Sequence, residues 1–188
     1  MAGSSLQLAA IFMTSIYKLL LPSLVVTLLV GCATPATQQS MSVSFQDLPS
    51  SPSALLKGQV SVGSVTGGKD TNPMWASQVD APSFKGALDK SVAVVGYKAL
   101  DASTAKYRID AYLNELSQPL FGITFDVVSS VVYTVTGGGV QKQIPVTATG
   151  SASPSDAFVG IERLRIANER SIKENLKVFL QKLSDQFR

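Results

Sequence analysis

The chain has 188 residues, apolar residues make up 45% of it, and its formal net charge is only +3, so one globular domain is expected and a nucleic-acid partner is not. Histidine is absent, which excludes the usual Ser-His-Asp and Cys-His nucleophile arrangements, imidazole metal ligands and the commonest general base near neutral pH. Because the acidic residues form no close cluster either, we expect no catalytic residue, no cofactor and no metal site.

Residues 1–31 have the pattern of an export signal. Lys18 is their only charged residue, and the apolar run that follows it continues to Val30. This run of about 12 residues is shorter than the ~20 that a bilayer-spanning helix needs, which disfavours an uncleaved anchor. Met13 is an alternative start that would give a more compact leader.

The apolar run ends in the tetrapeptide Leu29-Val30-Gly31-Cys32. This tetrapeptide resembles the lipobox of bacterial lipoproteins, in which signal peptidase cuts before a diacylated cysteine. The resemblance implies that Leu29, Val30 and Gly31 are the signal-peptidase recognition residues and that Cys32 carries acyl chains, which attach the protein to a membrane. Cys32 is the only cysteine, so no disulfide is available. Ala33 follows it in place of the aspartate that retains such proteins at the inner membrane, so the resemblance implies the periplasmic face of the outer membrane.

A glycine-rich stretch, GSVTGGKD at residues 63–70, nearly matches the phosphate-binding pattern G-x-x-x-x-G-K-[ST]. Asp70 stands where the pattern requires a hydroxyl, and Asn72-Pro73 disfavours the helix that must follow at once. The periplasm also holds essentially no ATP. We therefore expect a surface loop and no nucleotide partner.

Residues 32–54 are rich in Ser, Thr, Pro and Gln, which predicts a lipidated flexible tether with a root-mean-square reach of about 25 Å. A short edge strand in the stretch SVSFQDL is the alternative for part of it. The folded domain is predicted over residues 55–188. It begins with a strand from Leu56 to Gly63, in which apolar and polar residues alternate.

The clearest helical pattern lies after Pro82, which suits a first turn, and before Gly96. Its apolar residues recur at helical spacing: Phe84, Ala87, Leu88, Val92 and Val95. Three strands are predicted next, over residues 107–116, 122–135 and 140–148, with a turn at Gly137–Gly139. Pro145 cannot donate to a strand ladder, which makes the third of these strands an edge.

A long C-terminal helix is predicted from Ser155 to Ser184. At about 45 Å it would exceed the width of such a domain, so either Gly160 breaks it or one end protrudes. Ser153 caps it and Asp156 completes an S-x-x-D box, with Pro154 in the first turn. Its buried stripe consists of Ile161, Leu164, Asn168, Ile172, Leu176, Phe179, Leu180, Leu183 and Phe187. On the exposed face we expect ion pairs between Glu169 and Lys173 and between Arg170 and Glu174.

The element order β-α-β-β-β-α predicts an α+β fold, a two-layer sandwich with a mostly antiparallel four-stranded sheet and two helices on one face. Together with the lipobox, this layout resembles small outer-membrane lipoproteins of the LptE and YajG types. The resemblance is one of topology, and it assigns no binding residue.

Three further features have both a structural and a functional interpretation. The connection 118–122 is either an exposed apolar tip that meets a partner or lipid, or a tip folded over the sheet edge. The stretch 72–75, with the only tryptophan, is either an interface anchor or a plug for the core. Arg163, Arg165 and Arg170 form either a basic patch for anionic envelope components or an ordinary solvated helix face.

The expected function is non-enzymatic: a lipid-anchored scaffold or accessory in cell-envelope assembly or maintenance, with an envelope protein as partner. The alternative is a carrier of lipid or glycan on the uncovered sheet face. Residues such as Arg108, Asp110, Tyr112, Thr124 and Thr134 make that face too polar for acyl chains. An envelope enzyme such as an acyltransferase is the third class. The chain has neither the histidine nor the short repeats of hexapeptide-repeat acyltransferases.

Overall fold

The structure, a computed structural model, describes residues 34–47, 49–69 and 78–188. The predicted export signal, Cys32 and the stretch 72–75 lie outside these residues. The main elements, in chain order, are α2 (Gln38–Met41), β1 (Val60–Gly67), α3 (Ala81–Val94), β2 (Tyr107–Ser117), β3 (Phe125–Gly137), β4 (Val140–Ala152) and α4 (Gly160–Gln186). Apart from the short α2, the order β-α-β-β-β-α is the predicted one.

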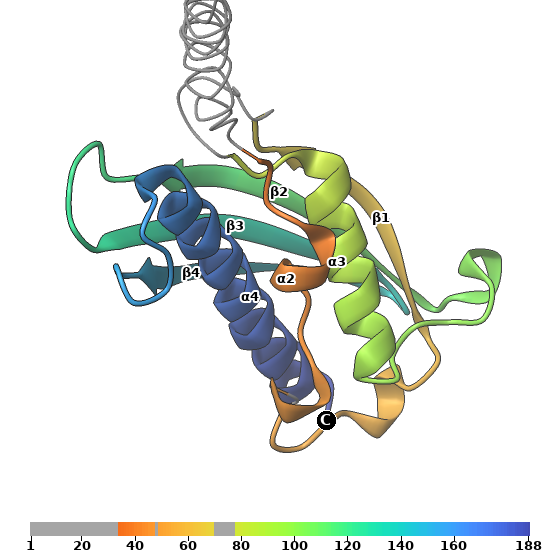
Figure 1. The fold of residues 1–188 in the computed structure, drawn as a ribbon. Helices are drawn as coiled ribbons and strands as arrows, with labels where there is room; N and C mark the ends of the chain where they lie inside the picture. Colours follow the sequence, from red (N-terminus) through yellow and green to blue (C-terminus); the bar gives the residue numbers. More distant parts are fainter. Residues whose placement is uncertain (1–33, 48, 70–77) are drawn as a thin grey trace, which may run out of the picture. The chain divides into compact units, whose positions relative to one another are not determined.

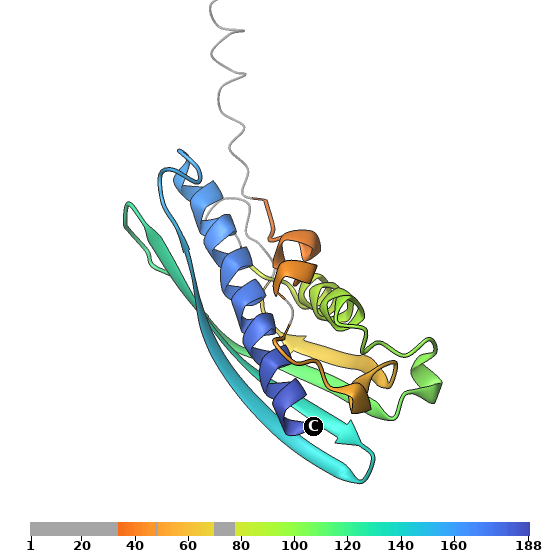
Figure 2. The same ribbon diagram turned by 90° about the horizontal axis from the view of Figure 1, so that it is seen from below.

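The four strands form one sheet in the order β1-β2-β3-β4. β1 pairs parallel to β2, and the other two pairs are antiparallel. α3 is the crossover of the parallel pair, and it lies on the same face of the sheet as α4 (Figures 1 and 2). The predicted α+β two-layer fold is therefore confirmed, and Pro145 does lie on an edge strand, β4.

The core lies between the sheet and the helices, where alternate strand residues point inward. On β2, Tyr107, Ile109, Ala111 and Leu113 are buried while the residues between them are not. Tyr133 of β3 stacks on Phe179 of α4 with 3.7 Å between ring centroids. The period of two in the sequence thus identified the buried side of these strands.

A polar group of side chains is buried where α4 crosses the sheet. Asn175 donates to the backbone oxygens of Ser129, at 3.2 Å, and Val146, at 3.1 Å. It accepts from the Tyr133 hydroxyl at 2.8 Å, and burial raises the pKa of Tyr133 well above its usual value. Because its partners are in place, Asn175 avoids the cost of an unsatisfied buried amide. Gly150 lets α4 approach β4 this closely, since a Cβ there would clash with the backbone of Ser171.

The predicted flexible tether is wrong for the described residues of 32–54. Ala36, Met41 and Val43 are buried in the main core, and α2 lies between α3 and α4 (Figure 1). The Val43 N–H donates to the hydroxyl of Ser91 on α3 at 3.0 Å. Further along, the Ser53 N–H donates to the buried hydroxyl of Tyr97 at 2.6 Å. Composition predicted a coil, but a few apolar residues fill a gap that only the packed helices create.

The stretch SVSFQDL forms a 3-10 helix, Phe45–Asp47, in place of the alternative edge strand. The carboxylate of Asp47, in this helix, forms an ion pair with Lys173 of α4, with 2.8 Å between the Lys173 Nζ and the carboxylate oxygen. Burial alone would raise the pKa of Asp47, but hydrogen bonds from Lys173 and Ser44 outweigh it and lower the pKa to about 2. This ion pair is a further link between the segment and α4.

The first strand and the last helix begin later than predicted. β1 starts at Val60 and continues to Gly67, so Gly63 lies in a strand and not in a surface loop, while Asp70 lies outside the described residues. α4 starts at Gly160. One bond of the predicted S-x-x-D box forms, with the Ser153 N–H donating to the Asp156 carboxylate at 2.9 Å. The Asp156 N–H donates to the Ser153 carbonyl at 2.9 Å in place of the hydroxyl, and this closes an isolated turn. Arg170 also binds Asp156, at 2.7 Å, and holds that turn beside the helix.

Within the described ranges, no helix combines the length and the apolar character needed to cross a bilayer.

Met41→Ala tests whether residues 34–47 belong to the folded domain. Met41 is fully buried, so the substitution should lower the free energy of unfolding by about 2–5 kcal/mol. The measurement is urea denaturation of the chain from Ala33 onward, which forms a compact unit. Phe45→Ala is the control, because Phe45 is exposed in the same segment and should change stability by only about 0.5 kcal/mol. Equal, small effects of both would mean that the segment does not pack.

Candidate functional site

The predicted lipidation site, Cys32, and its recognition residues Leu29, Val30 and Gly31 lie outside the described residues. The nearest part that the structure describes is the leading segment, which we define as residues 34–47. Its start is fixed on the domain: the Ala36 N–H donates to the Gln78 carbonyl at 3.3 Å, and the Thr37 N–H donates to Glu169 Oε1 at 2.8 Å. The candidate site is therefore the end of the domain at which the chain from Cys32 joins it.

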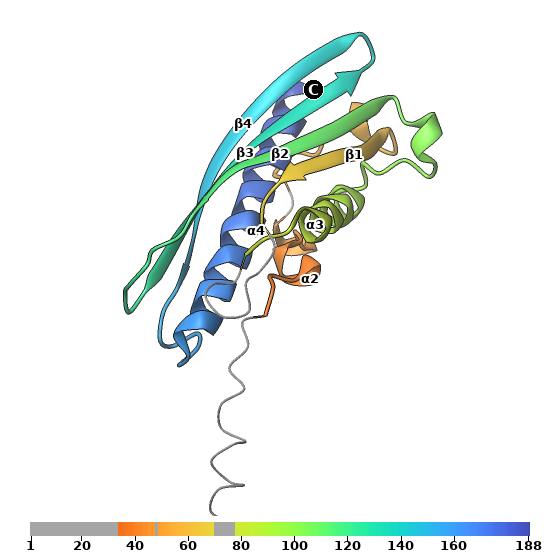
Figure 3. The same ribbon diagram turned by 90° about the horizontal axis from the view of Figure 1, so that it is seen from above.

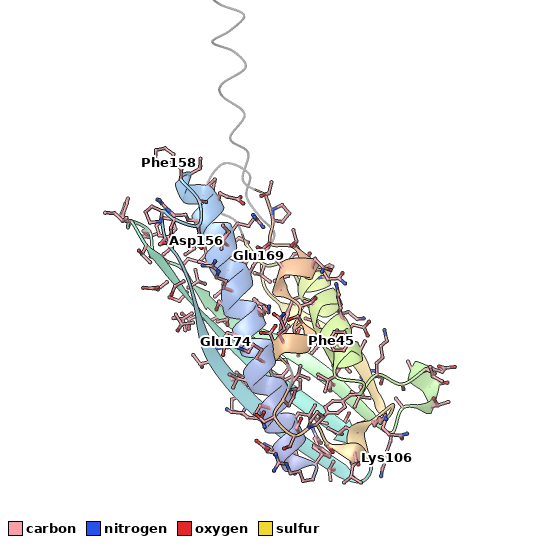
Figure 4. The ribbon with its side chains drawn as sticks, turned by 60° about the horizontal axis from the view of Figure 1, so that its bottom comes forward. Phe45, Lys106, Asp156, Phe158, Glu169 and Glu174 are labelled. Atoms are coloured by element: carbon pink, nitrogen blue, oxygen red, sulfur yellow. The ribbon has the colours of Figure 1, made fainter. Side chains whose placement is uncertain are left out.

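Glu169 is the anchor of the leading segment. Glu169 is only 5% exposed. Besides the Thr37 N–H, its carboxylate accepts hydrogen bonds from the Thr37 hydroxyl at 3.2 Å and from Arg165 Nη1 at 2.5 Å. Arg165 also pairs with Glu162, and the hydrogen bond to Glu162 raises the pKa of the guanidinium. A buried carboxylate is stable only when paired and hydrogen-bonded, and Glu169 is both. Figure 4 shows Glu169 on the α4 side that faces the leading segment.

The ion pairs predicted on α4 are wrong, because Asp47 and Asp156, which lie outside the helix, pair with Lys173 and Arg170. Lys173 pairs with Asp47 and not with Glu169. Arg170 pairs with Asp156 at 2.7 Å, and Glu174 pairs with Lys177 at 2.9 Å. The i,i+4 rule considers one helix alone, so it could not anticipate the contacts of Lys173 and Arg170 with residues outside α4.

Large apolar side chains are exposed on two chain connections. Between β2 and β3, Leu120, Phe121 and Ile123 are 87%, 90% and 75% exposed, so the alternative of a tip folded over the sheet edge is wrong. Between β4 and α4, Phe158 is 93% exposed and Val159 follows it. Figures 2 and 3 show both connections at the same end of the domain. Phe158 and Val159 were not predicted to be exposed, because the predicted helix began at Ser155 and included them.

Hydrogen bonds join the leading segment to the first of these connections. Gln78, whose carbonyl binds Ala36, donates from its amide to the Gln118 side chain at 3.2 Å. Gln118, directly after β2, in turn donates to the Asn168 side chain of α4 at 2.8 Å. The root of the 118–124 connection and the start of the domain therefore lie together.

The second connection meets the first through Phe125, two residues after Ile123. The guanidinium of Arg163 lies 5.4 Å from the Phe125 ring centroid, and the same ring borders Gly160, next to Val159. Hydrogen bonds from Arg170 and from the Ser153 N–H lower the pKa of Asp156, the one acidic residue of the β4–α4 connection.

The predicted basic patch of Arg163, Arg165 and Arg170 does not form as a unit. Arg165 and Arg170 are neutralised by carboxylates. Arg163 makes no ion pair within the described residues, and its Nε is buried there without a hydrogen-bond partner. One unneutralised cation thus lies beside the exposed apolar connections.

Elsewhere the described surface offers less chemistry. Among described residues, no three His, Cys, Asp or Glu side chains are grouped to hold a metal ion. A hollow of about 640 Å³ is lined by Lys69, Gln78, Tyr112 and Leu120 among others, but residues 70–77, which join two of its sides, lie outside the described part. On the uncovered sheet face, Arg108 pairs with Asp110 at 2.9 Å, which confirms its polar character. Thr124 lies outside the strands.

No family model matches the chain, and no curated protein does. Solved structures are similar in fold. A chain from Caulobacter crescentus CB15, described as a "putative lipoprotein", is 13% identical with a TM-score of 0.45, over 70% of this chain and 91% of that one. A hypothetical protein from Chlamydia trachomatis is 12% identical with a TM-score of 0.43, over 69% and 95% of the two chains. At these identities the similarity concerns the fold alone.

Glu169→Ala should release the start of the leading segment. The Thr37 N–H loses a charged acceptor, a bond that contributes about 1.5–3 kcal/mol, so amide hydrogen exchange at residues 36–43 should accelerate by about tenfold or more. Hydrogen exchange with mass spectrometry measures this. Glu174→Ala is the matched control, because Glu174 pairs with Lys177 on the same helix. Exchange that is unchanged in both variants would show that Glu169 does not hold the segment.

Proposed function

We propose that this protein is a bacterial lipoprotein, attached through acyl chains on Cys32 to the periplasmic face of the outer membrane, and that it acts there without catalysis as a scaffold or accessory in cell-envelope assembly or maintenance. The observation that carries the proposal is the sequence Leu29-Val30-Gly31-Cys32 at the end of an apolar run. Cys32 lies four residues before Ala36, the first buried residue in the part of the chain that the structure describes.

The described chemistry favours binding over catalysis. Carboxylates that catalysis would use as acids or bases need a pKa near the working pH. Here the pKa values of Asp47, Asp110 and Asp156 are lowered by their hydrogen-bonded partners, against the effect of burial. Each of these carboxylates accepts hydrogen bonds from a basic residue in an ion pair, so its charge stabilises the fold.

The uncovered sheet face favours a protein partner over a carried lipid. Arg108, Asp110 and Thr134 lie on it, and the Ser64 N–H donates to Asp110 at 2.6 Å. Such a face suits polar contacts with another protein, or with a glycan, better than it suits acyl chains. Glycan carriage is therefore the second candidate function.

Mass spectrometry of the protein from native membranes tests the anchor. We expect a mature chain that begins at Cys32 and carries acyl chains, recovered in the outer-membrane fraction. Cys32→Ala should accumulate as an uncleaved precursor. An unmodified leader on the wild-type protein, or recovery from the cytosol, would contradict the proposal.

Crosslinking in intact cells tests the scaffold role. A photo-crosslinking residue at Thr134, on the uncovered face, should trap one defined envelope protein, and one at Leu100, exposed at another edge of the domain, should not trap it. A muropeptide or other glycan retained at Thr134 in place of a protein would favour the carrier function.

A further inference from the structure

We infer that the end of the domain carrying the 118–124 and 153–159 connections lies in the lipid headgroup region, with Phe121 and Phe158 inserted among the lipids beside the acyl anchor. The inference rests on the proposed acylation of Cys32. It goes beyond anchoring, because it gives the folded domain one fixed orientation and a second contact with the membrane.

The first reason is the length of chain between anchor and domain. Two peptide units separate the Cα atoms of Cys32 and Thr34, so whatever the conformation these atoms lie at most about 7 Å apart. The predicted tether, with 22 residues after Cys32, would have let the domain move away by about 25 Å. Instead Ala36 and Thr37 are already bonded to Gln78 and Glu169. An acylated Cys32 therefore brings this end of the domain to the bilayer surface.

The second reason is what this end presents to the bilayer. The stretch from Gln118 to Phe125 has no charged residue, and its tip exposes Leu120, Phe121 and Ile123. Phe158 and Val159 extend this apolar surface from the neighbouring connection. Single exposed apolar residues are ordinary on soluble proteins, but a group of them at one end marks a surface that binds apolar material.

The third reason is the arrangement of charge around these side chains. Asp156, the only acidic residue on either connection, is paired with Arg170. Arg163, beside Phe125, makes no ion pair within the described part of the chain. An interfacial segment combines apolar side chains that enter the acyl boundary with cations that meet lipid phosphates. The guanidinium of Arg163 is positioned for the second role.

Figure 4 shows the two ends of the domain that this orientation distinguishes. Phe158 lies at one end of the domain and Lys106 at the opposite end. Leu100, in the connection that leads to Lys106, is fully exposed. Like Phe121, Leu100 is a large apolar residue with a highly exposed side chain. Because it should point away from the membrane, it is a matched control.

The test places a fluorescent label at three positions of the full acylated protein. Because Cys32 is the only cysteine and acylation consumes its thiol, Phe121→Cys, Phe158→Cys and Leu100→Cys can each be labelled at one site with an environment-sensitive dye. The proteins are inserted into vesicles of phosphatidylethanolamine and phosphatidylglycerol with brominated acyl chains, and vesicle flotation confirms attachment. All three substitutions are at exposed positions, so folding should be retained.

We expect blue-shifted, quenched emission at positions 121 and 158 and an aqueous, unquenched spectrum at 100. Attached protein with all three labels in water would overturn the inference and leave the acyl anchor standing. Attached protein with position 100 quenched as strongly as 121 would also overturn it. Protein that does not float, with Cys32 unmodified by mass, would contradict the proposed function and the inference with it.

Discussion

The bond between the Thr37 N–H and the buried carboxylate of Glu169 determines where the domain begins, and much of the structure depends on it. It aligns the leading segment so that Met41 enters the space between α3 and α4, where it is fully buried. α3 and α4 lie on one face of the sheet but contact each other over only a small area, which leaves a gap between them. The leading segment fills the gap between the two helices and completes the core. Fixing this segment also fixes the place at which the chain leaves toward Cys32.

The sheet and α3 could be predicted because each buries one face. Their buried apolar residues therefore recur in the sequence at the spacing of a strand or of a helix. Ile109 and Leu113 are two pleats apart on β2, and Phe84 and Leu88 are one turn apart on α3, so local spacing alone identifies them. The start of α4 could not be predicted in the same way. The side-chain bonds of an S-x-x-D stretch are common to a helix start and to an isolated turn, and the choice between them here involves Arg170, fourteen residues beyond Asp156.

The candidate site was less predictable than the fold for the same reason. Glu169 has basic residues four positions before and after it, and helix rules alone do not choose between Arg165 and Lys173. Asp47, from the leading segment, takes Lys173, and Arg165 is left for Glu169. The leading segment was assigned as a coil because averages over composition hide two or three decisive apolar residues. Only the gap between two distant helices gives Met41 its importance.

The short link to the membrane that we propose through Cys32 would restrict where a partner can bind. With 34–47 packed on α4, an acylated domain cannot turn freely, so its surfaces become distinct in role. In the orientation that we infer, the end with Phe158 faces the lipid and the end with Lys106 faces away from it; Figure 4 shows these two residues at opposite ends of the domain. The uncovered sheet face, with the Arg108–Asp110 pair, then stands at the side. A partner in the same membrane, or in a layer parallel to it, would meet that face laterally, and rigid attachment reduces the rotational freedom that such an association must otherwise lose.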